Sequence, residues 1–388
     1  MSLKISKKYS LFVTQLLLVK LFATLATLFF YPKLATNALS DADRYLSASF
    51  EPSFVNLLDR TSFTDFIFSA FGLLFNPIQI HLLVSFVVAW VIAYLFRESY
   101  SYLERFEFWS VFLLPHFLIW TSIVGKEVLV IVPFFLIVET CVDLVVRKRI
   151  SYGYLVVKSF LCFSVAFLLR PHYLMAYLFL FFSSMAFRGI NLVSSRYTYE
   201  FSLGFMGSVL LFVASVLSSL IYYSLSIWRN YLQKIMVFTE NHFLSYDSAA
   251  SNRWHIPWET VADFFSNAWW GIPASMVGPT FDEALERPVF TIVFFEGIVS
   301  ICLIFYFLVK LLAFGFYEKR FKSIVVFLFI PALIIGLIAH YPFGLFNAGS
   351  ALRYKQSLAP LLYFYPLLLT SKIKSLKFSR EGHLKQNI

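Results

Sequence analysis

Residues 165–177 read VAFLLRPHYLMAY and place an arginine, a proline and a histidine inside a stretch that is otherwise as apolar as a lipid tail. A guanidinium at the centre of a membrane helix costs roughly 2.5–3.5 kcal/mol, so such residues usually line a cavity or mark a membrane surface. Pro171 has no backbone N–H to donate and therefore ends the preceding helix. The stretch predicts two membrane helices, near 153–170 and 172–187, joined at a polar turn.

The composition indicates a polytopic membrane protein. Of the 388 residues, 59% are hydrophobic and 14% are charged, whereas about a quarter of the residues of a soluble domain are charged. Mean hydropathy is +0.74. The cysteines at 141, 162 and 302 lie in apolar runs, and their odd number and wide spacing match neither a disulfide framework nor a zinc site.

Ten apolar runs are long enough to cross about 30 Å of hydrocarbon. The predicted spans are 11–31, 79–96, 108–123, 128–146, 153–170, 172–187, 201–227, 289–311, 323–339 and 357–371. The first has the basic and apolar parts of a signal peptide but nearly spanning length, so we interpret it as an uncleaved anchor. The predicted fold class is all-α, a helical bundle forming a single membrane domain over 1–388.

The charged residues predict the orientation. Basic residues gather in short segments on one side, such as RKR at 147–149 and the tail at 372–388, while acidic residues favour the other side. This is the positive-inside pattern, so both termini should be cytoplasmic. The same pattern explains the net charge of +10 without nucleic acid as a partner.

Two long loops, 32–78 and 228–288, then face outward. Both exceed the usual length of a connection. Helical spacing of apolar residues within 257–270 predicts a short helix that lies in the membrane interface. The apolar run at 62–76 predicts a second segment that either lies in the interface or dips into the membrane.

Four polar groups fall on the predicted outer rim, and each has a simpler alternative. The groups are SDADRY (40–45), TSIVGKE (121–127), the Arg-Pro-His turn (170–172) and NAGSALRYKQS (347–357). In the same order, the alternatives are a helix-capping aspartate in a solvated loop, an exposed turn pair or a snorkelling lysine, a lipid-headgroup anchor, and an interfacial belt.

Together these groups suit transfer of a glycosyl unit from a lipid-linked phosphate donor. Fixed cations can hold a pyrophosphate, since arginine gives bidentate contacts and lysine a point charge. The candidate pyrophosphate ligands are Lys126, Arg170, Arg353, Tyr354 and Lys355. A carboxylate or a histidine can deprotonate a hydroxyl nucleophile, and the candidates are Asp41, Asp43, Glu127 and His172.

The outer tryptophans have two interpretations. Trp254, Trp258, Trp269 and Trp270 can stack on sugar rings or anchor the loop in the interface. The sequence contains no metal-ligand cluster of recognisable spacing, no Gly-rich phosphate loop and no GxSxG nucleophile.

Four short motifs carry a resemblance to a known family. HFLIWTSIVGKE (116–127), the arginine of LLRPHY (168–173), DADRY (41–45) and NAGSALRYKQSLAP (347–360) resemble bacterial O-antigen and exopolysaccharide polymerases of the Wzy type. The resemblance follows the order of spans and loops over most of the chain. It implies an architecture similar to that of GT-C glycosyltransferases, in which the acidic position of the first outer loop matches Asp41 or Asp43.

The resemblance implies an enzyme of the bacterial inner membrane with a periplasmic site and no metal or other cofactor. It would transfer a growing glycan from undecaprenyl pyrophosphate to a newly flipped lipid-linked repeat unit, with Arg170 and Arg353 on the pyrophosphate. Its partners would be that lipid-linked oligosaccharide and membrane lipid, with a chain-length regulator and a flippase as further candidates. The large loop has few arginines, Arg229, Arg253 and Arg287, which disfavours glycan capture by an arginine-rich loop alone.

Two other functions stay open. One is a GT-C transferase that adds a single sugar from a polyprenyl phosphate donor, for which a stronger acidic pair and a soluble carboxy-terminal domain are typical. The other is a lipid-linked oligosaccharide flippase or transporter, for which charges deep in several helices are typical. The charged residues within predicted spans are Lys20, Glu139, Asp143, Lys158 and Glu296, most of them near span ends.

Overall fold

The chain is all-helical where the structure describes it. The computed structural model describes residues 7–34, 41–49, 58–147, 150–197, 230, 233–234, 237, 258, 260–317 and 319–386, and no strand occurs among them. The contacts divide the chain into two units: unit 1 is Met1–Tyr177 with Gln356–Ile388, and unit 2 is Leu178–Lys355. The all-α fold class is therefore confirmed for these residues, while one membrane domain over 1–388 stays a prediction.

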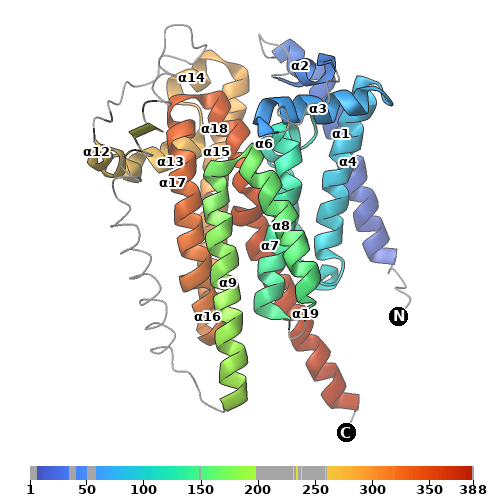
Figure 1. Cartoon of the computed structure of the whole chain (residues 1–388), viewed down its shortest axis with the longest axis vertical. Helices are drawn as coiled ribbons and strands as arrows, with labels where there is room; N and C mark the ends of the chain where they lie inside the picture. Colours follow the sequence, from blue (N-terminus) through green and yellow to red (C-terminus); the bar gives the residue numbers. More distant parts are fainter. Residues whose placement is uncertain are drawn as a thin grey trace. The chain divides into compact units, whose positions relative to one another are not determined.

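Unit 1 consists of long helices and several shorter ones, of which α2 and α3 lie at one end of α4 (Figure 1). Its helices are α1 (Lys7–Leu34), α2 (Ala42–Ser47), α3 (Arg60–Gly72), α4 (Pro77–Phe96), η2 (Tyr100–Tyr102), α5 (Arg105–Phe112), α6 (Pro115–Trp120), α7 (Lys126–Val146), α8 (Tyr152–Leu169), η4 (Gln356–Leu358), η5 (Pro360–Phe364) and α19 (Tyr365–Gln386). Helix α9 (Pro171–Tyr197) begins in this unit and continues into unit 2. Figure 1 shows α2 and α3 beside one end of α4, with α7 and α8 side by side.

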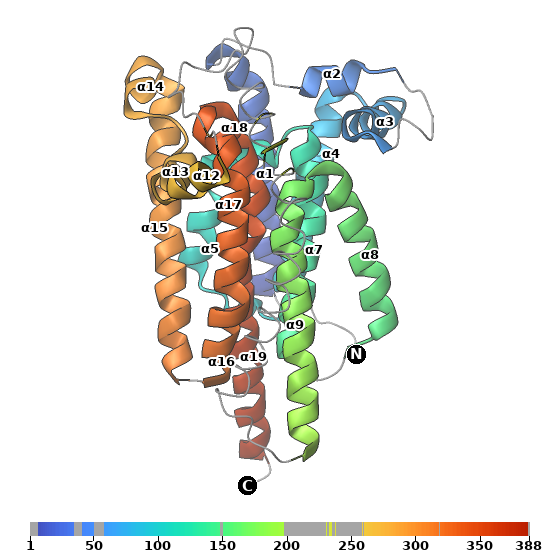
Figure 2. The ribbon, with the colours of Figure 1, turned by 60° about the vertical axis from the view of Figure 1, so that its left-hand side comes forward.

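Unit 2 is organised around two long helices. Its further helices are α12 (Val261–Ser266), α13 (Ala268–Val277), α14 (Phe281–Glu286), α15 (Pro288–Tyr317), α16 (Lys319–Ile324), η3 (Val325–Phe329), α17 (Ile330–Phe346) and α18 (Ala348–Lys355). Figure 2 shows α13, α14 and α18 gathered at one end of α15 and α17, against which they pack.

Seven helices among the described residues are long and apolar enough to cross a membrane. They are Lys7–Phe30, Pro77–Phe96, Lys126–Val146, Tyr152–Leu169, Pro171–Ile190, Pro288–Gly315 and Phe321–Phe346. Each corresponds to a span predicted from the sequence, which supports a polytopic helical membrane protein. The predicted total of ten is not reached in the described residues, and the span at 201–227 lies outside them.

Two predicted spans are not single α-helices. The run at 108–123 is split into α5 and α6 at Leu114, because Pro115 cannot donate a backbone hydrogen bond and disfavours helical backbone in the residue before it. The run at 357–371 comprises a 3-10 turn, a π turn and the start of α19. Every residue from Lys355 to Lys372 is buried.

Capping residues set several helix starts. Asn76 and Gln79 form a capping box at α4, with Pro77 in the first turn. In the stretch predicted to be helical from 257, the helix starts at Val261, because Thr260 and Asp263 form the capping box there. The helix predicted within 62–76 is confirmed as α3, which starts at Arg60 after the Asp59 cap.

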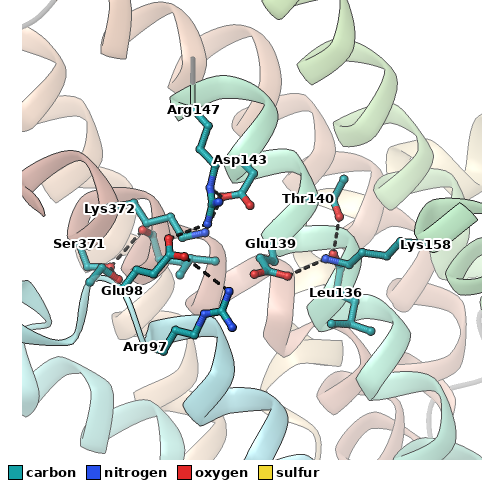
Figure 3. Close-up of polar contacts among 12 residues, drawn as sticks. Arg97, Glu98, Leu136, Glu139, Thr140, Asp143, Arg147, Lys158, Ser371 and Lys372 are labelled. Carbon is teal, nitrogen blue, oxygen red and sulfur yellow. Dashed lines mark hydrogen bonds and ion pairs between the residues drawn. The ribbon is translucent and has the colours of Figure 1, made fainter. Parts of the chain in front are cut away.

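A network of ion pairs joins α19 to the ends of α4 and α7 in unit 1 (Figure 3). Lys372 Nζ lies 2.5 Å from Asp143 Oδ1, and Arg147 contacts both Asp143 at 2.9 Å and Glu98 at 2.6 Å. Ser99 and Ser371 share a buried hydrogen bond of 3.0 Å. Because the Lys372 side chain is only 6% exposed, its charge depends on Asp143 for compensation.

Asp143→Ala should lower the free energy of unfolding by about 3 kcal/mol, because it leaves the Lys372 ammonium, 6% exposed, without its carboxylate. Denaturant unfolding in detergent micelles measures the loss. The matched control is Glu104→Ala, which breaks the 2.5 Å pair with Lys374, whose side chains are 50% and 30% exposed, and should cost less than about 1 kcal/mol. Equal losses in the two variants would contradict a special role for the buried pair.

Candidate functional site

Arg170 lies at the junction of α8 and α9, as the Arg-Pro-His turn predicts. It caps the carboxy-terminal end of α8, its backbone N–H donates to Ala166 O at 2.8 Å, and Pro171 begins α9. Its side chain is buried and forms an ion pair with Glu127, in the first turn of α7. An arginine buried against a carboxylate is not a lipid-headgroup anchor, so this alternative does not hold.

The Arg170–Glu127 pair excludes water from two opposite charges. The exposed fractions of the two side chains are 6% and 2%. Removing one partner of such a pair is costly because the other charge is left buried. Gly125 leaves room for it: a Cβ at this position would lie 2.7 Å from Glu127 Oε2 and would displace the carboxylate.

Lys126 connects the same turn to α3. Its Nζ donates to Thr61 Oγ1 at 2.7 Å. Thr61 lies beside Asp59, which caps α3 by accepting the backbone N–H groups of Thr61 and Ser62 at 2.9 Å each. The backbone N–H of Ser62 holds the pKa of Asp59 below its usual value, and the charge of Lys126 contributes in the same direction. Lys126 is thus fixed by α3 and not simply snorkelling.

Asp59 and Asp65 lie within electrostatic range of this lysine, and Asp41, which precedes α2, lies within range of Asp65. Asp41, Asp59 and Asp65 are termed here the α2–α3 carboxylates. Burial raises the pKa of the Asp65 carboxyl, and Asp59 and Asp41 raise it further, while Arg44 and Lys126 oppose the rise. A raised pKa makes the carboxylate a stronger base, which favours abstraction of a proton. Asp65 was not among the residues predicted for the site, because an isolated aspartate in an apolar helix gives no pattern in sequence.

The structure brings some of the other predicted catalytic residues into the same unit. Asp41 precedes α2 and makes no side-chain cap, although Tyr45 Oη donates to its Oδ2 at 3.4 Å. The capping alternative for Asp41 therefore does not hold. Asp43 lies within electrostatic range of His81 on α4. His172, in the first turn of α9, has its ring 4.3 Å from that of Tyr173.

In unit 2, the predicted ligand Lys355 is buried at the end of α18. Its Nζ lies 3.3 Å from Glu296 Oε1 and donates to Met276 O at 3.1 Å. Ser300 Oγ donates to the same carboxylate oxygen at 2.9 Å. Burial lowers the pKa of Lys355, and Glu296 opposes that change. These contacts of Lys355 explain its burial by packing and ion pairing within unit 2.

The neighbouring residues Arg353 and Tyr354, also predicted to bind pyrophosphate, are only partly buried in the last turn of α18. The ring of Tyr354 packs against Phe343 at a centroid distance of 5.6 Å. Because Arg170 belongs to unit 1 and Arg353 to unit 2, their action on one pyrophosphate stays a prediction.

The four tryptophans have different surroundings. Trp258 is buried, with its ring packed against Phe264, Tyr341 and Phe346, so core packing accounts for it without a sugar. Trp270 is partly buried and donates to Asn267 Oδ1 at 3.2 Å, whereas Trp269 is 79% exposed. Trp254 lies outside the described residues. Among the tryptophans whose surroundings are described, Trp269 is the best placed to contact a ligand or lipid.

The charged residues inside predicted spans have partners that the sequence did not reveal. Lys158 Nζ lies 2.6 Å from Glu139 Oε2, between α8 and α7. Lys20 is fully buried in α1 and donates to the hydroxyls of Thr121 and Ser122 in the turn before α7. The aromatic faces of Phe112 and Phe117 lie 6.0 and 5.6 Å from its ammonium. A lysine in an apolar helix signals in the sequence that Lys20 needs partners. The sequence does not show which ones, because Thr121 and Ser122 are about a hundred positions further along the chain.

Comparison of the chain with protein-family models, with curated proteins and with solved structures finds no match. The resemblance to polysaccharide polymerases therefore rests on the four short motifs, and it stays a prediction.

A double-mutant cycle tests the Arg170–Glu127 pair. Arg170→Met and Glu127→Gln should each lower the free energy of unfolding by about 3–5 kcal/mol, because each leaves one buried charge unmatched. The double variant should lose much less than the sum, since both charges are gone. Denaturant unfolding of the four proteins in one detergent measures this, and additive losses would mean that the two side chains do not interact.

Proposed function

We propose that the protein polymerises lipid-linked oligosaccharide repeat units by transferring the growing glycan from undecaprenyl pyrophosphate to a sugar hydroxyl of a new unit. The observation that supports this proposal best is the grouping of Lys126, the Arg170–Glu127 pair and the α2–α3 carboxylates around the start of α7 in unit 1. Cations beside acids of differing pKa, at one end of apolar helices, suit a reaction between a lipid pyrophosphate and a neutral hydroxyl.

In the proposed reaction, the acceptor hydroxyl oxygen attacks the anomeric carbon of the donor glycan. The bond between that carbon and the pyrophosphate oxygen breaks, and its electron pair leaves with the pyrophosphate. A carboxylate among Asp41, Asp43 and Asp65 takes the hydroxyl proton, so atoms and charge balance. Lys126 stabilises the negative charge that develops on the leaving group.

The ion pair has a defined part in this proposal. Because Glu127 neutralises Arg170, the pair brings a guanidinium to the site without net charge in the apolar interior. Arg170 then donates N–H groups to the pyrophosphate, and Glu127 holds the Arg170 guanidinium in place. Glu127 is thereby proposed as a positioning residue, where the sequence predicted a catalytic one.

The proposal includes the orientation and the membrane. The end of unit 1 that carries α2 and α3 would face the periplasm, and the protein would reside in the bacterial inner membrane. The positive-inside distribution of lysine and arginine supports this orientation. A newly flipped lipid-linked unit would then reach the site from the outer leaflet.

Deletion of the gene tests the function and its alternatives. A polymerase deletion should leave surface lipopolysaccharide with a single repeat unit, or accumulate lipid-linked single units. Gel separation of the surface polysaccharide reports the result. Loss of all repeats would favour a flippase, and a ladder of normal length lacking one sugar would favour a single-sugar transferase.

Complementation of the deletion tests the site. Lys126→Ala, Arg353→Ala and the charge-balanced double variant Arg170→Met with Glu127→Gln should each insert normally and abolish the ladder. The matched control is Arg60→Ala, an exposed arginine in the first turn of α3, which should restore it. A normal ladder from Lys126→Ala and the double variant would reject the pyrophosphate role.

A further inference from the structure

Gln356 and Ser357 are buried polar residues for which the proposed mechanism has no role. They form the start of the 3-10 turn η4 in unit 1, and each is 0% exposed. Among the described residues, the amide nitrogen and oxygen of Gln356 and the hydroxyl of Ser357 have no hydrogen-bond partner. Buried polar side chains normally have partners, because an unmatched group loses its hydration without compensation.

The backbone around these residues is irregular. The 3-10 turn η4 is followed at once by the π turn η5, and π turns inside helices occur frequently at functional sites. Tyr177 Oη donates to the carbonyl oxygen of Ser357 at 2.8 Å. The turn packs against α6 and α7, the two helices on either side of the connection at 121–125 that precedes Lys126 and Glu127. The unmatched groups therefore lie on elements that also build the candidate site.

The chemistry of the two side chains selects the kind of ligand. The Gln356 amide offers two N–H donors and one acceptor, and the Ser357 hydroxyl can donate or accept. A phosphate would match the donors but would face the amide oxygen, and a cation would match the oxygens but would face the N–H groups. A hydroxyl group donates and accepts, so it matches both.

We infer that Gln356 and Ser357 bind sugar hydroxyls of the lipid-linked glycan. This inference rests on the proposed function, since that function supplies the sugar. Water can make the same hydrogen bonds, so the experiment below distinguishes a bound sugar from bound water. A site of this kind would hold the acceptor or donor sugar in place, and Gln356 would determine affinity more than turnover.

The test uses the purified full-length protein in detergent, with the lipid-linked repeat unit extracted from the deletion strain as the probe. Gln356→Leu replaces the amide with an apolar group of similar size. Its unfolding midpoint without the probe should equal or exceed that of the wild type, because an unmatched buried amide is gone. The rise in midpoint that the probe gives the wild type should disappear, and KM for the probe should rise about tenfold with kcat changed less.

The matched control is Gln15→Leu, the same substitution at an exposed glutamine of α1, which should behave as the wild type. Ser357→Ala, a smaller change, should also weaken binding of the probe and tests the site if Gln356→Leu fails to fold. Wild-type KM and an undiminished midpoint shift in the variants would overturn the inference and assign the site to water. Binding of the probe by the wild type without chain lengthening would reject the proposed function but keep the sugar site.

Discussion

The ion pair between Arg170 and Glu127 fixes the end of the molecule on which the proposed site depends. It joins the residue that caps the end of α8 to the first turn of α7, and Pro171 redirects the chain into α9 at the same point. Gly125 leaves space for the Glu127 carboxylate, and the neighbouring Lys126 donates a hydrogen bond to Thr61 of α3. Without the pair, a guanidinium would lie in an apolar interior, so the same contact that stabilises the helices also provides the proposed anion-binding group.

The same constraint recurs along the membrane helices. Three acidic residues in the described spans are matched within the protein: Glu139 by Lys158, Asp143 by Lys372, and Glu296 by Lys355. Lys20 instead meets hydroxyls and aromatic faces. Ion pairing within the bundle explains these charges, so they need no charged transport path.

The sequence predicted much of the fold, because membrane spans depend on local hydropathy and Arg-Pro-His marks a helix boundary by its own chemistry. It did not predict that a single proline divides the apolar run at 108–123, or that the run at 357–371 begins with irregular turns. Site residues were harder to predict, since the pairing of Arg170 and Glu127 spans 43 positions and the proximity of Asp65 to Lys126 depends on how α3 packs. Trp258 was a candidate for sugar stacking or interfacial anchoring, but its ring is buried in a hydrophobic cluster. The sequence does not distinguish an aromatic residue exposed in a loop from one that packs into a core.

The polar side chains around the start of α7 lie at one end of apolar helices in unit 1. This is the arrangement that the proposed reaction of a lipid-linked substrate requires. The most direct test is reconstitution of the purified protein in lipid vesicles with an undecaprenyl-pyrophosphate-linked repeat unit. A polymerase should form glycans of two or more repeats on one lipid, with one undecaprenyl pyrophosphate released for each bond formed. Repeat units that stay single on their lipids, with folded protein present, would contradict the proposed function.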